Sequence, residues 1–241
     1  MAIYTSKTRI DLEDVGYSNK ITNKAILKIL ENAGARQSET IHFGLNDMEN
    51  VGFSWILLGW KVKILKRPIY NEELTINTWG RESNRIFTYR DYEIYDESGE
   101  LCTIATSKWA IVDINTGKLR ELTPEIIEKY QCETKKVFKE DYTLKLKEPV
   151  TIIRRQEYKA QRRDIDINKH IHNLYYLDYA YETLPEEVYE APECNNIEIM
   201  YKKQIRLNDE FKCLYTKEEN QNIVTMKSKD ENTLHAIIKL Y

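Results

Sequence analysis

The sequence has no long apolar run. No stretch approaches the roughly 18 consecutive apolar residues that cross a bilayer as a helix. The opening residues, MAIYTSKTRIDLEDVGYS, lack the apolar core of a secretion signal. We therefore expect a cytoplasmic protein with no segment inserted in a membrane.

Cysteine is scarce and scattered. The cysteines form no C-x-x-C pair and no cluster with histidine at metal-ligand spacing. They are Cys102, Cys132, Cys194 and Cys213. This spacing favours isolated thiols over a disulfide framework, a zinc site or a catalytic cysteine. We expect neither a metal nor another cofactor.

An excess of basic charge is also missing. The formal net charge is -3 at pH 7, and no nucleic-acid-binding motif is recognisable, so we expect no nucleic-acid partner. Hydrophobic residues make up 41% of the chain and charged residues 31%. This composition is typical of a globular protein with a sizeable core.

One long helix precedes a series of strands. Residues 21–34, ITNKAILKILENAG, have helical apolar spacing, with Thr22 or Asn23 as N-cap and Gly34 as the stop. Residues 55–114 instead contain the strand-like runs WILLGWKVKIL, ELTINTW, RIFTYRDYEIYD and ELCTIATSKWAIVDI, separated by turn signals such as DESG and NTGK. A helix followed by an antiparallel meander predicts an α+β fold.

This pattern occurs twice. An offset of 150 residues aligns KITNKAILKIL with HIHNLYYLDYA, and an offset of 137 aligns ILKRPIYNEELTI with YKKQIRLNDEFKC. Such order-preserving similarity predicts two copies of one helix-and-sheet unit, with a chance match as the alternative. We expect domains at 1–130 and 149–241. The helix TPEIIEKY, with Thr123 as N-cap, precedes a connector over 131–148, in which YTLKLKEPV is a candidate edge strand.

Only the second copy carries a set of reactive side chains. Asp166, Asn168 and His170 form a D-x-N-x-H pattern, and the first copy has Gly, Ser and Lys at the matching positions. If these polar residues served only the fold, the first copy would need similar ones. The difference favours chemistry over scaffold, with drift between duplicated halves as the alternative.

The residue types of this set suit acyl transfer. An aspartate can act as general base or nucleophile, an asparagine can orient a partner or donate to an oxyanion, and a histidine can shuttle protons. In an extended segment the alternation projects all three to one side. Leu174 and Leu177 mark a helix directly afterwards, whose first N–H groups can stabilise a developing negative charge.

The remaining histidines lack such a pattern. His172 stands beside Asn173, an expected helix cap, which indicates a local hydrogen-bond partner rather than a catalyst. His42 and His235 have no chemistry nearby in the sequence and stay unassigned.

Three segments together carry a family resemblance. RRDIDINKHIHNLYYLDYA, WILLGWKVKILKRPIYNEELTINTW and RDYEIYDESGELCTIATSKWAIVDINTGK resemble the acyl-ACP thioesterases of bacterial and plant fatty-acid synthesis, and the similarity spans essentially the whole chain. It implies two tandem hot-dog domains, each a long helix wrapped by a curved antiparallel sheet, with catalysis in the C-terminal copy.

The resemblance also implies the site. The family's catalytic aspartate, asparagine and histidine fall on Asp166, Asn168 and His170, with Asp166 as nucleophile or as general base. Plant members carry an acidic residue where this chain has Gln204, and a glutamine cannot act as a base. Gln204 then orients a water or another group, or Asp166 acts alone, or the enzyme is weak.

The implied substrate is a fatty-acyl thioester of acyl carrier protein, which is hydrolysed to free fatty acid while the N-terminal copy holds the acyl chain in an apolar pocket. Basic residues around the active copy would attract this acidic carrier. They are Arg154, Arg155, Lys159, Arg162, Arg163, Lys202 and Lys203. An acyl-CoA thioesterase and a non-catalytic acyl-binding protein are the alternatives. The sequence determines neither the acyl chain length nor the choice between monomer and homodimer.

Overall fold

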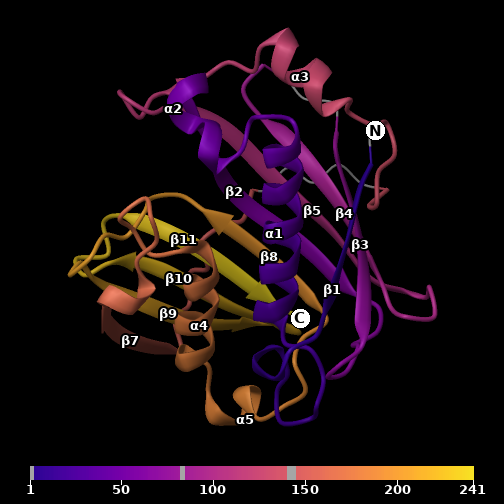
Figure 1. Ribbon diagram of the computed structural model, residues 1–241. Coiled ribbons are helices and arrows are strands. Elements are labelled where there is room, and N and C mark those ends of the chain that lie inside the picture. Colours follow the sequence, from indigo (N-terminus) through magenta and orange to yellow (C-terminus); the bar gives the residue numbers. More distant parts are fainter. Residues whose placement is uncertain (1–2, 82–84, 140–144) are drawn as a thin grey trace. The chain divides into compact units, whose positions relative to one another are not determined.

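The computed structural model describes residues 3–81, 85–139 and 145–241. The chain divides into two compact units, Met1–Thr143 and Leu144–Tyr241. Each unit contains one antiparallel sheet and one main helix (Figure 1). No helix of the described residues has both the length and the apolar composition to span a membrane.

The N-terminal unit is built on a sheet in the order β1-β3-β4-β5-β2, with β6 paired to β5. Its strands are β1 (Tyr4–Arg9), β2 (Phe53–Ile64), β3 (Glu73–Gly80), β4 (Thr88–Tyr95), β5 (Leu101–Asp113) and β6 (Leu119–Arg120). Its helices are α1 (Asn23–Thr40), α2 (Met48–Val51) and α3 (Pro124–Tyr130), with short 3-10 turns at Leu12–Asp14 and Leu45–Asp47. The strands expected between residues 55 and 114 are therefore confirmed.

The C-terminal unit has a sheet in the order β8-β11-β10-β9-β7. Its strands are β7 (Arg154–Lys159), β8 (Asn196–Tyr201), β9 (Glu210–Glu218), β10 (Gln221–Ser228) and β11 (Leu234–Leu240). Its helices are α4 (Asn173–Thr183) and α5 (Glu186–Tyr189), with a 3-10 turn at Arg162–Asp164.

Helix α1 begins as predicted and ends later than predicted. The Thr22 side chain accepts a hydrogen bond from the Ala25 N–H at 3.2 Å, which identifies Thr22 as the N-cap. Gly34 does not stop the helix, which continues to Thr40. A Cβ atom at Gly34 would lie 3.0 Å from the Tyr92 hydroxyl. The glycine therefore serves close packing against the sheet inside the helix, and a local stop signal does not reveal this.

The segment after α3 packs back on the N-terminal unit. The Thr123 side chain caps α3 by accepting from the Ile126 N–H at 3.4 Å, as predicted. Beyond the helix, the Glu133 N–H donates to the Gly80 carbonyl at 2.8 Å. The candidate edge strand YTLKLKEPV begins outside the described residues, and its described part, residues 145–150, forms no strand.

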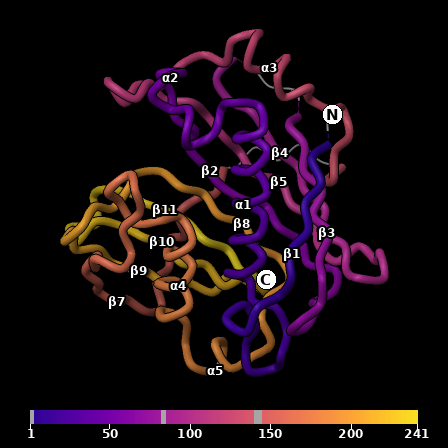
Figure 2. Tube along the Cα trace, in the orientation of Figure 1, coloured from indigo at the N-terminus to yellow at the C-terminus, as the bar shows by residue number. Residues whose placement is uncertain are grey.

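The duplication is confirmed element by element. Arg9 pairs with Glu73 between β1 and β3, and Lys159 pairs with Glu210 between β7 and β9, at the offsets read from the sequence. In both units the trace runs from a strand through a 3-10 turn into the main helix (Figure 2). Isolated bridges repeat as well: Val15 with Ile21 and Ile165 with Ile171, Lys20 with Ile69 and His170 with Arg206.

The two main helices differ in length. Helix α1 has 18 residues and α4 has 11. Helix α4 ends at Thr183, immediately before Leu184 and Pro185, because a residue that precedes proline is disfavoured in helical conformation. Arg154 then donates to the Leu184 carbonyl at 2.9 Å. The first unit therefore carries two extra helical turns for which the second unit has no counterpart.

Candidate active site

The D-x-N-x-H residues occupy a tight turn between the 3-10 turn Arg162–Asp164 and α4. The Asp166 N–H donates to the His170 carbonyl at 3.0 Å, and the Lys169 N–H donates to the Asp166 carbonyl at 3.0 Å. Lys169 has a positive φ of 63°. The segment is therefore not extended, and the condition under which the alternation would project all three side chains to one side is not met. Asp166 Oδ1 accepts from the Asn168 N–H at 2.8 Å, and such a local side-chain bond stabilises a turn in place of a strand.

Asp166 and His170 lie together in this turn. Asp166 Oδ2 is 3.7 Å from His170 Nδ1, and the two side chains are 14% and 23% exposed. His170 Nδ1 also lies 3.3 Å from the Ile171 carbonyl oxygen. The structure thus places a carboxylate beside an imidazole at a half-buried position.

The Asn168 side chain does not join this pair. Asn168 is exposed, and within the described residues only its backbone N–H contacts Asp166. The turn reverses the chain between Asp166 and His170, so the three side chains do not share one side as they would in an extended segment.

Gln204 lies on a segment that runs next to the turn. The neighbouring Ile205 carbonyl accepts from the Ile171 N–H at 2.8 Å, and Arg206 forms a backbone bridge with His170. The Gln204 side chain is exposed and forms no hydrogen bond within the described part of the chain. The structure thus brings the backbone of Gln204 near His170 without joining its amide to the pair.

In the first unit an arginine occupies the position of Gln204. At the offset of 137 residues this is Arg67, whose Nη2 donates to Asn23 Oδ1 at 2.7 Å and whose Nη1 donates to the Ile21 carbonyl at 2.9 Å. Arg67 therefore fastens the start of α1 to the segment between β2 and β3. Within the described residues Gln204 makes no such bond to the start of α4. The signal for this difference lies in the alignment of the two repeats.

The start of α4 offers fewer free donors than expected. The N-cap is His172 rather than Asn173, and His172 Nδ1 accepts from the Leu174 N–H at 3.3 Å. The local role expected for His172 is confirmed. Because that N–H is already occupied, an oxyanion would have to bind other donors of this first turn.

Comparison with known proteins follows the same division of the chain. The family model for the acyl-ACP thioesterase N-terminal domain matches residues 1–130, and the one for the C-terminal domain matches residues 147–239. The chain belongs to the acyl-ACP thioesterase family.

Curated relatives are plant members of the family. Oleoyl-acyl carrier protein thioesterase 2, chloroplastic, of Arabidopsis thaliana is 25% identical over 238 residues, covering 92% of this chain and 65% of the relative. The oleoyl-acyl carrier protein thioesterase, chloroplastic, of Coriandrum sativum is 23% identical over 240 residues, covering 93% and 65%. This chain thus spans less than two thirds of the length of these relatives.

Solved structures share the fold. An acyl-ACP thioesterase from Bacteroides thetaiotaomicron matches with a TM-score of 0.86 and 22% identity, covering 99% of this chain and 97% of the other. The 12:0-ACP thioesterase from Umbellularia californica matches with a TM-score of 0.87 and 17% identity, covering 100% and 96%. The predicted α+β class with two tandem hot-dog domains is confirmed.

In this family member Asp164 holds the site turn at both ends, a role that the sequence analysis missed. Asp164 is 3% exposed, and its Oδ2 accepts from the Gln161 N–H at 2.7 Å and from the Tyr179 hydroxyl at 2.6 Å. Its carbonyl accepts from the His172 N–H at 2.9 Å. Burial and the Asp164 carboxylate both raise the pKa of the Tyr179 phenol, so it stays a donor.

The first unit has an aspartate with similar contacts at the position that matches Asp164. Asp14, at the offset of 150 residues, accepts from the Asp11 N–H at 3.2 Å and lies 2.5 Å from Lys28 Nζ. Its carbonyl accepts from the Thr22 N–H at 2.9 Å. The aspartate repeated at both positions is the signal in the sequence that could have identified this role.

The remaining histidines have structural surroundings. His235 on β11 is 6% exposed, and its Nδ1 lies 2.8 Å from the Lys203 carbonyl oxygen. The Lys202 N–H donates to the His235 carbonyl at 2.8 Å. His235 thereby holds the segment that carries Gln204.

The His42 side chain is 83% exposed and lies 3.8 Å from Asp47. Among the described residues no group of three or more His, Cys, Asp or Glu side chains is placed to hold a metal ion.

Proposed function

We propose that this chain hydrolyses the thioester of fatty acyl-acyl carrier protein and releases a free fatty acid. The observation that supports this function best is the half-buried Asp166–His170 pair, 3.7 Å apart, in the unit whose twin lacks both residues. Membership of the acyl-ACP thioesterase family indicates the substrate class. On this proposal the N-terminal domain over 1–130 holds the acyl chain and the domain over 149–241 is catalytic.

On this proposal the two oxygens of Asp166 have different tasks. Oδ1 accepts the Asn168 N–H, and Oδ2 faces His170. Oδ2 can remove a proton from water as the water oxygen adds to the thioester carbonyl, or can itself attack that carbon. The C–S bond then breaks, and a proton held by His170 neutralises the departing thiolate. On the second route water then hydrolyses the acyl–aspartyl anhydride, which releases the fatty acid and restores the Asp166 carboxylate.

Asn168 and Gln204 are proposed as orienting residues. Both side chains are exposed and carry amides that can donate to an oxygen and accept from water. Neither can serve as a base. Gln204 takes the place of an acidic residue and would hold a water molecule at the open start of α4, where Arg67 closes the first unit.

Turnover of acyl-ACP by single variants tests these roles. Asp166→Asn and His170→Ala should each lower kcat by about 100-fold or more, because positioned acid–base groups typically contribute about 10²–10⁴-fold. Lys20→Ala, at the matching position of the first unit, is the control and should keep the wild-type rate. Gln204→Ala should lower kcat less than Asp166→Asn does.

Rates near wild type for both Asp166→Asn and His170→Ala would refute the assignment. A wild-type rate for Gln204→Ala would remove only that residue from the site. Acyl-CoA and acyl-ACP of one chain length, compared in the same assay, test the carrier. Retention of a fatty-acyl ligand without turnover would support a non-catalytic acyl-binding protein instead.

Docking of the acidic carrier is proposed on the C-terminal unit. Part of the expected basic set has local partners: Arg155 lies 3.7 Å from Glu231, and Arg163 lies 3.7 Å from Asp164. Within the described residues the others form no ion pair, and those left without one are Arg154, Lys159, Arg162, Lys202 and Lys203. Unpaired surface cations attract an acidic partner most strongly.

Location and oligomeric state stay predictions. We propose the cytoplasm for this chain on the sequence expectation alone, whereas the plant relatives are named chloroplastic. A monomer and a homodimer are both compatible with two tandem units, and sedimentation of the purified chain would distinguish them.

A further inference from the structure

Arg90 is a buried cation whose hydrogen-bond partners are all neutral. It lies on β4 with 7% of its surface exposed. Its Nη1 donates to Gln37 Oε1 and, at 3.3 Å, to Thr78 Oγ1. The guanidinium carbon is 5.4 Å from the centre of the Tyr130 ring. Within the described residues Nε and Nη2 donate no hydrogen bond, and no carboxylate forms an ion pair with Arg90.

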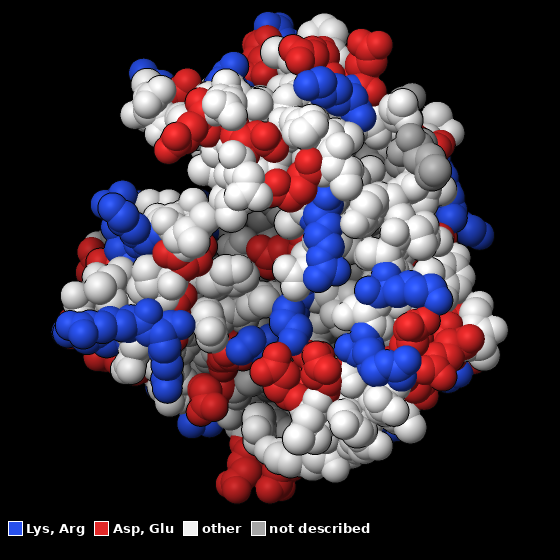
Figure 3. Space-filling model, in the orientation of Figure 1, with Lys and Arg blue, Asp and Glu red and all other residues white. Residues whose placement is uncertain are grey.

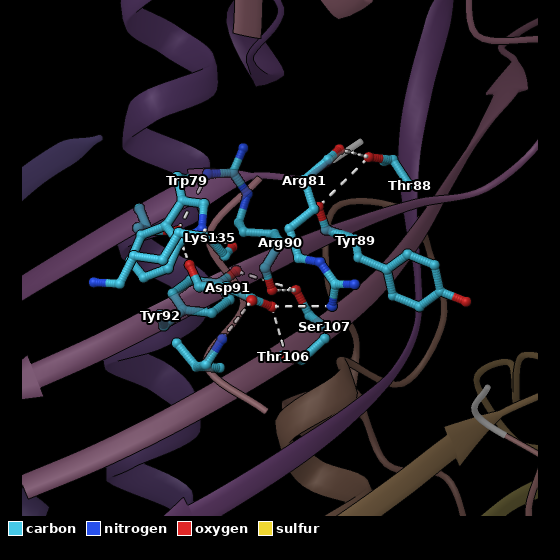
Figure 4. Close-up of polar contacts among 12 residues, drawn as sticks. Trp79, Arg81, Thr88, Tyr89, Arg90, Asp91, Tyr92, Thr106, Ser107 and Lys135 are labelled. Atoms are coloured by element: carbon cyan, nitrogen blue, oxygen red, sulfur yellow. Dashed lines mark hydrogen bonds and ion pairs between the residues drawn. The ribbon is translucent and has the colours of Figure 1, made fainter. Parts of the chain in front are cut away.

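The neighbouring carboxylates act elsewhere. Successive side chains of a strand point to opposite faces, so Asp91 leaves the sheet on the other side. It accepts from the Thr106 hydroxyl at 2.6 Å and from the Val137 N–H at 3.0 Å, and Arg81 lies 3.7 Å away. In Figure 4 the Arg81 guanidinium reaches toward Asp91, and the Arg90 side chain leads away from it. Glu31 of α1 influences the Tyr92 phenol but forms no ion pair with Arg90.

The fold does not require this cation. Gly80 pairs with Arg90 in the first unit, and Lys217 pairs with Asn222 in the second, so Asn222 is the counterpart of Arg90. Asn222 is neutral, and its Oδ1 accepts from the Tyr215 hydroxyl at 2.9 Å. Gln37 lies in the extra turns of α1 that α4 lacks. A buried charge without a counter-charge is unfavourable. The first unit has such a charge at Arg90, and the second unit has the neutral Asn222 at the matching position.

The surroundings fix the guanidinium for a bidentate ligand. Gln37 is 4% exposed, and a Cβ atom at Gly34 would lie 3.2 Å from Arg90 Cδ, so helix and side chain are in close contact. The unused donors, Nε and Nη2, form the edge that binds both oxygens of a carboxylate at once. The guanidinium also lies against the Tyr130 ring, and Arg90 is almost wholly buried. A ligand at this depth must lose its hydration shell, which favours a carboxylate carried by an aliphatic chain over a hydrated small anion.

We propose that Arg90, oriented by Gln37 and Thr78, is a carboxylate-binding site in the N-terminal unit, and that its ligand is a free fatty acid. The identity of the chain rests on the proposed function, of which a fatty acid is the product. Occupancy of this site would let the product remain on the protein after hydrolysis and slow the next turnover.

Intrinsic fluorescence can test this site directly, because all four tryptophans, Trp55, Trp60, Trp79 and Trp109, lie in the N-terminal unit. Dodecanoate, dodecanol and acetate are titrated into the full chain below the concentration of micelle formation. The variants are Arg90→Met and Arg90→Lys, with Arg85→Met as control. Arg85 is an exposed arginine of the same unit, 2.6 Å from Glu121.

Dodecanoate should bind wild type and Arg85→Met about tenfold or more tighter than dodecanol. A charge-assisted bidentate pair is strong, and a tenfold change in Kd needs a difference of only about 1.4 kcal/mol in binding free energy. In Arg90→Met the two affinities should become similar, and Arg90→Lys should be intermediate. Equal affinities in wild type would overturn the proposal. Acetate binding that matches dodecanoate and depends on Arg90 would show a small-anion site and would overturn the fatty-acid assignment.

Thermal unfolding separates a ligand site from a structural residue. Without ligand, Arg90→Met should melt close to the wild-type temperature, because removal of an unpaired buried charge at similar volume offsets the donor that buried Gln37 loses. A midpoint several degrees lower would identify Arg90 as structural and overturn the proposal. The titration needs no turnover. An inactive protein that still prefers dodecanoate over dodecanol would therefore refute only the hydrolase function. An active protein without that preference would refute only the Arg90 site.

Discussion

Asp164, a residue without a proposed chemical role, determines how Asp166 and His170 are presented. Its side chain and its carbonyl together bind Gln161, His172 and Tyr179, so both ends of the site turn are fastened to one buried group. Hydrogen bonds to an ionised group are roughly twice as strong as neutral ones. The short contact between Tyr179 and Asp164 should therefore support both stability and positioning.

Removal of the Tyr179 hydroxyl tests this role. Tyr179→Phe leaves a buried carboxylate with one donor fewer, which should lower the free energy of unfolding by about 1–3 kcal/mol. If the turn loosens, kcat should fall while KM for acyl-ACP changes little. Urea unfolding and steady-state kinetics measure the two effects. Tyr4→Phe, whose hydroxyl has no hydrogen-bond partner within the described residues, is the control. A stability loss with unchanged kcat would restrict Tyr179 to the fold.

At the scale of elements, the segment from Tyr201 to Arg206 lies beside the start of α4, and residues 64–69 lie beside the start of α1. In the first unit its counterpart carries Arg67, which donates to Asn23 and to the Ile21 carbonyl. In the second unit it carries Gln204, and buried His235 holds the preceding Lys202 and Lys203 by their backbone. The site is therefore supported by β11 as well as by its own turn.

The support from His235 should depend on pH. Burial lowers the pKa of His235, so the folded chain keeps it neutral where the unfolded chain already takes up a proton. Its contribution is therefore complete above the unfolded pKa of about 6.5 and is lost as pH falls below that value. Urea unfolding between pH 7.5 and pH 5.5 should show a smaller loss of stability for His235→Gln than for wild type. His42→Gln, at an exposed position, should behave like wild type. Equal slopes for His235→Gln and wild type would contradict this role.

Elements governed by local interactions could be predicted from the sequence. The caps Thr22 and Thr123 and the strand periodicity of residues 55–114 depend on neighbours within a few positions. The errors arose where distant contacts or side-chain geometry decide. Gly34 lies inside the helix where Tyr92 approaches too closely for a larger residue, and Asp166 lies in a turn whose backbone hydrogen bonds are the same as those of Gly16 in the first unit. A D-x-N-x-H pattern alone contains neither fact.

At the scale of the whole molecule, the two units share one strand register but differ in their buried and reactive side chains. The repeat offsets predicted the strand pairing and the pairing of each turn with its helix. They could not predict that the first unit holds a buried arginine where the second has Asn222, because a single alignment shows only that the residues differ. In the first unit Lys7 of β1 lies 2.7 Å from Glu73 of β3, and Arg9 of β1 lies 3.6 Å from Glu97. Basic and acidic side chains lie side by side on the face of the molecule that Figure 3 shows.

The proposed docking of an acidic carrier on the second unit can be tested by reversing charges there. Lys202→Glu and Lys203→Glu should raise KM for acyl-ACP several-fold, with kcat unchanged, because charges at the rim of an interface mainly change association. Added salt should weaken wild-type binding in the same direction. Lys63→Glu on β2 of the first unit is the matched control. An increase in KM of equal size for Lys63→Glu would locate the attraction in overall charge rather than in this segment.

The aspartate shared by both units, Asp14 and Asp164, separates the architecture of the turn from its chemistry. The same backbone bridge forms whether the loop displays Gly, Ser and Lys or Asp, Asn and His. Inactive forms made at positions 166, 168 or 170 should consequently remain well folded. They would be suitable for trapping an uncleaved acyl thioester in a crystal.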